Sequence, residues 1–148
     1  MKKWLMILIP IIVIGLGAFL IVNFMNSTTF EEEISDLADE FGEISEIIVY
    51  EHSGNQVSDE SVVLDEQEEI YHFLDAPSGM ELKHVSSQPV DWVYSLVVFR
   101  EESQTRQVFF IAENEIGMGG NYYEVNGQNE LIEYIDNADL DWRDPSNN

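Results

Sequence analysis

The sequence predicts an α+β protein. We expect an N-terminal transmembrane helix followed by a small domain, in which two to three helices pack on an antiparallel sheet of about five to six strands. Three observations lead to this prediction: a long uncharged apolar run near the N-terminus, segments whose apolar residues recur with helical spacing, and segments in which apolar residues alternate. The links between successive alternating segments are short, which favours antiparallel pairing.

Residues 4–25 form the apolar run, which is long enough to cross a membrane. At about 1.5 Å per residue it spans roughly 33 Å, against a hydrocarbon core of about 30 Å. Lys2 and Lys3 precede the run and all 29 acidic residues follow it, which predicts a cytoplasmic N-terminus and an extracytoplasmic C-terminal part. A cleaved secretory signal is the alternative, but the run is longer than such a signal needs and lacks a small-residue cleavage site. We therefore expect a retained signal anchor and a single-pass protein of the cell membrane.

The chain divides into four predicted parts. Residues 1–25 hold the cytoplasmic tip and the anchor, and residues 26–43 form an acidic linker and juxtamembrane helix. The folded extracytoplasmic domain is expected over residues 44–138. Residues 139–148 are interpreted as an acidic tail.

Helices and strands are predicted from the spacing of apolar residues, which recur every three to four residues in a helix and every second residue in a strand. Strands are expected at residues 44–52, 61–64, 80–87, 92–101, 106–113 and 122–125. Helices are expected at residues 29–41, 66–75 and 128–138. Thr29 and Glu32 match a capping box at the start of the first helix. The EIGMGGN stretch at residues 115–121 is interpreted as a glycine-rich loop.

Composition excludes several classes of protein. With 6 Lys and Arg residues against 29 Asp and Glu residues, the net charge is −23, and the basic patch that nucleic-acid binding requires cannot form. The absence of cysteine excludes disulfides, thiol catalysis, zinc–thiolate sites and an acylated lipoprotein. Residues 31–81 contain 17 acidic residues and no Lys or Arg. We interpret this segment as a solvated face, with repulsion from anionic lipids and adaptation to an alkaline or saline exterior as alternatives.

The sequence contains no motif that predicts a catalytic residue, a cofactor site or a metal ligand. His52, His72 and His84 are too widely spaced for a pair of metal ligands on one element. The carboxylates near the C-terminus lack the spacing and the glycine of a calcium loop. The glycines of residues 117–120 lack the lysine that follows in a phosphate-binding loop.

Two predicted strands, residues 92–101 and 106–113, carry apolar side chains on both faces, so both faces of the sheet need a cover. The two later helices can cover one face. The other is left to the helix at residues 29–41, to an oligomeric partner or to a ligand. If a partner covers it, the binding residues are expected in the sheet and the glycine-rich loop: Trp92, Tyr94, Met118, Tyr122 and Tyr123.

The stretch from Ile44 to Ile135 resembles small membrane-anchored extracytoplasmic domains of unknown function from Firmicutes. The resemblance rests on an I..I.VY opening strand, a short strand leading into LDEQEEIYHFL, the segments WVYSLVVF and RQVFFI, and a YYEV strand before the last helix. It implies an anchored bacterial α+β domain and carries no activity with it.

Three functional hypotheses follow. The first is a membrane-anchored extracytoplasmic interaction module without catalytic activity, which binds another envelope protein. The second is an acidic envelope domain that binds divalent metal weakly, motivated by the acidic segment. The third is an envelope hydrolase, which needs a deep cleft holding one of the three histidines beside an acid.

Overall fold

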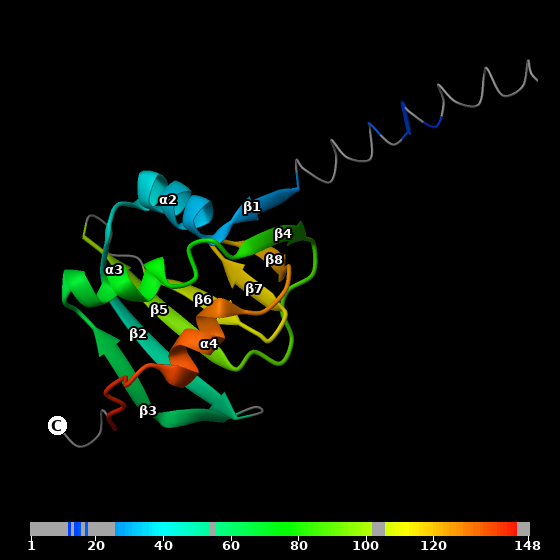
Figure 1. Cartoon of the computed structure of the whole chain (residues 1–148). Coiled ribbons are helices and arrows are strands. Elements are labelled where there is room, and N and C mark those ends of the chain that lie inside the picture. Colours follow the sequence, from blue (N-terminus) through cyan, green and yellow to red (C-terminus); the bar gives the residue numbers. More distant parts are fainter. Residues whose placement is uncertain are drawn as a thin grey trace, which may run out of the picture.

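The computed structural model describes residues 12, 14, 15, 17, 26–53, 56–101 and 106–144. Over these residues, eight strands form one antiparallel sheet in the order β1-β4-β8-β7-β6-β5-β2-β3 (Figure 1). The strands are β1 (Ser27–Thr29), β2 (Ile44–Ser53), β3 (Gln56–Leu64), β4 (Glu81–Val85), β5 (Tyr94–Arg100), β6 (Gln107–Ile111), β7 (Glu115–Met118) and β8 (Asn121–Val125). The helices are α2 (Phe30–Phe41), α3 (Gln67–Asp75) and α4 (Glu130–Asn137).

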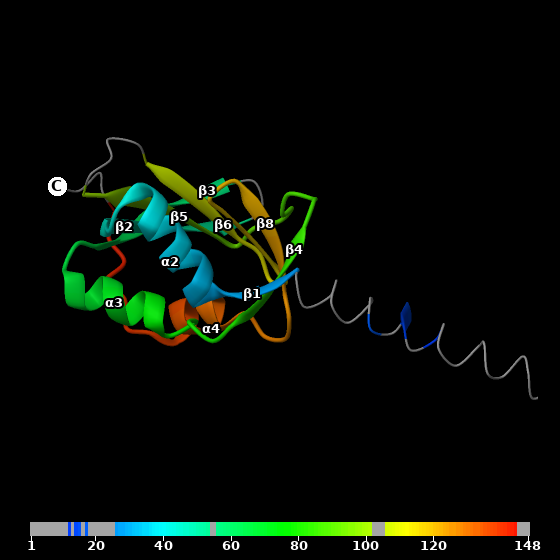
Figure 2. The same cartoon turned by 90° about the horizontal axis from the view of Figure 1, so that it is seen from above.

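All three helices pack on the same face of the sheet, as Figure 2 shows. Leu96 of β5 and Phe109 of β6 lie opposite each other on that face, and both are fully buried. Each helix contributes an apolar side chain to the same core: Phe30, Phe73 and Leu131. The hydrophobic core therefore lies between one face of the sheet and the helix layer.

Helix α2 belongs to this folded domain. Its capping box is confirmed, because the Glu32 amide donates to the Thr29 hydroxyl and the Thr29 amide donates to the Glu32 carboxylate. Phe30 and Leu37 are buried in the core. The helix does not cover the second face of the sheet, since it lies on the same side as α3 and α4.

The predicted strand number of five to six is wrong, because the sheet contains two further strands. Residues 27–29, interpreted as linker and helix start, pair with β4 as strand β1. The supposed glycine-rich loop begins as strand β7, which pairs with β6 and β8. Gly119 and Gly120 join β7 to β8 with positive φ angles of 59° and 83°, the backbone of a two-residue hairpin turn. The glycines thus form a turn between paired strands.

The predicted transmembrane helix is contradicted. Within the described part of the chain, no helix combines the length and the hydropathy that a membrane span needs. The same finding contradicts three predictions that depend on this helix: the retained signal anchor, the membrane-anchored fold class and the single-pass membrane localisation. Most of residues 4–25 lie outside the described residues. The membrane contact that the sequence predicts for this segment therefore falls on residues that are not described. The prediction rested on apolar length, which is necessary for a span and not sufficient.

Two buried tyrosines tie the helices to the sheet. The Tyr94 hydroxyl of β5 donates to Asp136 of α4 at 2.6 Å. The Tyr123 hydroxyl of β8 donates to Glu33 of α2 at 2.5 Å. Burial and the neighbouring carboxylate both raise the pKa of Tyr94, and burial and Glu33 act in the same direction on the pKa of Tyr123.

This arrangement predicts a loss of stability at alkaline pH. The folded-state pKa of each tyrosine lies above its unfolded value, so the contribution is complete below about pH 10 and is lost as the pH rises further. Chemical unfolding followed from pH 8 to 11 should show a falling free energy in the wild type and a shallower fall in the Tyr94→Phe/Tyr123→Phe variant. Tyr71→Phe, which removes an exposed hydroxyl on α3, is the control. Parallel slopes in wild type and double variant would disprove the prediction.

Candidate functional site

The face of the sheet that points away from the helices is the first candidate site, and we call it the open face. Two rows of directly opposed residues cross it. The aliphatic row runs over four strands: Val63, Ile48, Val97 and Val108. The aromatic row runs over five strands: Tyr50, Ser95, Phe110, Gly117 and Tyr122. Solvent reaches both ends of the aliphatic row, where Val63 is 50% exposed and Val108 is 39% exposed.

Trp92 packs over the aromatic row. Its ring centroid lies 4.8 Å from that of Phe110 and 6.2 Å from that of His52, which it meets edge to face. The His52 Nε2 atom and the Ser95 hydroxyl are 2.8 Å apart and share a hydrogen bond. Burial lowers the pKa of His52. At neutral pH the imidazole is therefore uncharged and the row stays apolar.

Gly117 allows the aromatic row to continue across β7. A Cβ atom at this position would lie 3.2 Å from Cδ1 of Tyr122 and 3.6 Å from Cδ2 of Phe110. The two rings thus flank the glycine and cover its backbone, an arrangement by which aromatic side chains compensate for glycine in a strand. The row is a continuous, packed surface.

The structure separates the five residues that the sequence assigned to partner binding. Trp92 and Tyr122 are half-buried and belong to the open face. Tyr94, Met118 and Tyr123 are at most 7% exposed and belong to the core. In the strand predicted at residues 92–101, strict alternation would place Trp92 on the same face as Tyr94. Trp92 precedes β5, and the bend at Val93 interrupts the alternation before the strand begins at Tyr94. Trp92 packs against Phe110 and therefore lies on the opposite side.

The sequence pattern alone does not identify four further residues of the open face: Ile48, Tyr50, Val63 and Phe110. Their alternation was visible, because Ile48 and Tyr50 alternate with the core residues Ile47 and Val49. Alternation separates two faces without telling which one the helices cover.

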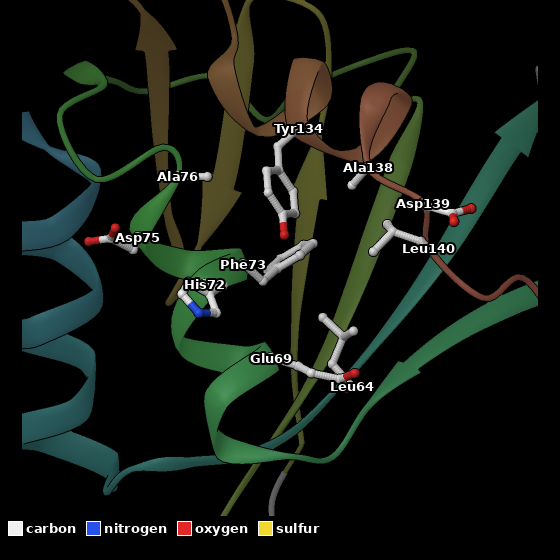
Figure 3. Close-up of a pocket in the computed structure, with 10 residues that line it drawn as sticks. All are labelled: Leu64, Glu69, His72, Phe73, Asp75, Ala76, Tyr134, Ala138, Asp139 and Leu140. Atoms are coloured by element: carbon white, nitrogen blue, oxygen red, sulfur yellow. The ribbon is translucent and has the colours of Figure 1, made fainter.

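A second candidate site lies between α3, α4 and β3, and we call it the acidic groove (Figure 3). Its first hollow has a volume of about 580 Å³, and a second hollow of about 760 Å³ continues it along β3. Tyr134 of α4 and Leu140 face Phe73 and Leu64 across the first hollow in Figure 3. The Glu69 carboxylate lies beside Leu64 in the same view.

The geometry favours neither weak binding of divalent metal nor a hydrolase. Among the described residues, no group of three or more His, Asp or Glu side chains is placed to hold a metal ion. The hydrolase hypothesis needs a histidine beside an acid in a deep cleft; His72 lines a hollow together with Glu69, but its side chain is 63% exposed and is not enclosed there. His52 lies on the open face, His84 of β4 packs edge to face against Tyr123 at 5.5 Å, and His72 lines the acidic groove with an exposed side chain.

The described part of the chain is an α+β domain whose antiparallel sheet carries helices on one face only. No family model matches the chain, and comparisons with curated proteins and with solved structures find no match. The resemblance to the Firmicutes domains stays a prediction. The function is therefore inferred from the geometry of the chain itself.

Proposed function

We propose that the protein is a non-catalytic interaction module that binds a partner protein through the open face. The supporting observation is the one-sided packing of the sheet. The helices bury one face, whereas the aliphatic and aromatic rows of the other remain in contact with solvent. Removing such apolar surface from water favours association, and contiguous exposed patches of this kind mark interaction sites.

The charge of the protein indicates the kind of partner. Acidic side chains flank the apolar rows on the open face: Glu46 opposite Phe99, and Glu115 opposite Glu124, which also lies opposite Lys83. A second copy would bring its own net charge of −23 against these acids, which opposes self-association. An apolar patch bordered by Lys and Arg complements the open face. We therefore infer a basic partner protein.

The experiment is site-directed photo-cross-linking of the full chain in the cells that make it. A photoreactive phenylalanine derivative replaces Val63, Val108 or, as control, Tyr71, which is 65% exposed on α3. Both open-face positions should give an adduct with the same basic protein, and Tyr71 should not. An adduct of equal yield at Tyr71, an adduct between two copies, or no adduct would overturn the proposal.

The cross-linked partner also allows a quantitative prediction. Trp92→Ala should weaken its affinity about thirtyfold or more, because truncating a central aromatic anchor costs about 2 kcal/mol or more. Tyr71→Ala should leave the affinity unchanged. Titration calorimetry measures both, and thermal unfolding establishes that each variant is folded. Equal affinities of wild type and the Trp92 variant would exclude the aromatic row as the binding surface.

A further inference from the structure

We propose that the acidic groove binds an extended polypeptide segment in which basic and apolar side chains alternate, laid along the outer edge of β3. The groove borders the open face at Val63, which ends the aliphatic row and also lines the groove. Its other lining residues lie outside the two rows, so this site is separate from the one in the proposed function. Its shape, its strand edge and its charge each point to such a segment.

The shape of the groove suits a chain rather than an ion. Its two hollows share four lining residues, Leu64, Glu69, Asp139 and Leu140, and so form one channel. The floor of the channel is apolar, because Leu64 and Phe73 lie in it with 5% and 1% exposure. A ligand that fills the channel therefore needs apolar groups on one side.

The strand edge favours a peptide. β3 is the last strand of the sheet, and Ser61 exchanges two backbone hydrogen bonds of 2.9 Å with Arg143. Backbone groups alternate in direction along a strand, so Val63 turns its N–H and C=O groups toward the same edge, where it lines the groove. Because Arg143 already occupies the edge at Ser61, an extended segment in the groove would meet the edge at Val63 and could exchange backbone hydrogen bonds with it there.

The residues that precede Arg143 turn away from the edge next to its bridge with Ser61. The Trp142 amide donates to the Leu140 carbonyl, and the Leu140 amide donates to the Ala138 carbonyl. These bonds curl residues 138–142 instead of extending them along β3. The curl forms the far wall of the groove and keeps the channel open.

The charge of the walls selects basic side chains. Asp65, Glu66 and Glu69 line one side, and Asp139 and Asp141 line the other. Arg143, which also lines the groove, forms an ion pair with Asp141. The acidic segment at residues 31–81, with no Lys or Arg, argues against a second copy as the source of the bound segment. Lysine or arginine side chains on the outward side of an added strand complement these walls.

The test uses a short labelled peptide of alternating lysine and valine and measures its binding to the full chain by fluorescence anisotropy. Neutralising the groove with Glu69→Gln/Asp139→Asn should weaken binding about tenfold. The control variant Asp39→Asn/Glu40→Gln removes the same charge from the exposed end of α2 and should change binding less than about twofold. Equal weakening by both variants would show attraction to the overall charge only and would overturn the proposal.

Two further peptides test the floor and the strand edge. A lysine–serine peptide should bind more weakly than the lysine–valine peptide, and a lysine–valine peptide methylated on alternate backbone amides should also bind more weakly. Equal binding of either one would overturn the proposal. If the groove variant fails to fold, Asp65→Asn/Glu66→Gln replaces it. Trp92→Ala should leave peptide binding unchanged, which separates the outcome at the groove from the outcome at the open face.

Discussion

Replacing Gly119 by alanine should destabilise the protein by about 2–4 kcal/mol, whereas alanine at the neighbouring Gly120 should cost about 1–2 kcal/mol. Both glycines adopt positive φ, which disfavours any residue with a side chain. Only at Gly119 does the added Cβ atom also collide with the core. It would lie 2.5 Å from Cδ2 of Leu37, whereas at Gly120 it meets nothing within 4 Å. The difference between the two losses of unfolding free energy therefore measures how closely α2 packs on the β7–β8 turn.

Urea unfolding at neutral pH measures both effects. The double variant Leu37→Ala/Gly119→Ala provides the control, because shortening Leu37 removes the atoms that collide. The cost of Gly119→Ala in that background should fall toward the cost of Gly120→Ala. Equal destabilisation by Gly119→Ala and Gly120→Ala in the wild-type background would contradict the close packing of α2.

Asn129→Ala should destabilise the protein by about 2–4 kcal/mol, because it removes a helix cap and leaves a carbonyl without its donor. Asn129 is 6% exposed. Its oxygen accepts from the Ile132 amide and caps α4, and its Nδ2 atom donates to the Ala112 carbonyl at 2.9 Å. One side chain thus joins α4 to the end of β6.

Asn137→Ala is the matched control, since Asn137 belongs to the same helix and its side chain makes an exposed hydrogen bond to the Glu133 carbonyl. It should change the free energy of unfolding by less than about 0.5 kcal/mol. Asn129→Asp keeps the cap and loses the donor, so its effect should fall between the two. A loss for Asn129→Ala no larger than that for Asn137→Ala would show that the buried amide adds nothing to stability.

Local patterns were sufficient for most elements. Helices expected at residues 29–41, 66–75 and 128–138 match α2, α3 and α4 within two residues at each end. Each has a strong apolar stripe, and for α2 the capping box marks the start. The β7 strand was not predicted, because the glycines of residues 115–121 are typical of a loop. Pairing with β6 and β8 on either side stabilises the strand, and this pairing cannot be deduced from the sequence of β7 itself.

The sites depended on long-range contacts. Strand alternation predicts that Trp92 shares a face with Tyr94, but the bend at Val93 interrupts the alternation and the two side chains lie on opposite faces. The acidic groove could not be predicted at all. Its walls come from β3, α3 and the segment after α4, and no motif connects Leu64, Glu69 and Asp139 in sequence.

The sequence by itself determined the helices, most strands, the α+β class and the strongly acidic surface, because these properties follow from local periodicity and composition. Tertiary structure alone decided that α2 joins α3 and α4 on one face and leaves the other open. That choice depends on side chains far apart in the chain, such as Tyr123 with Glu33 and Leu37 with Gly119. Local periodicity marks two faces of a strand, and only packing between distant elements decides which face is covered.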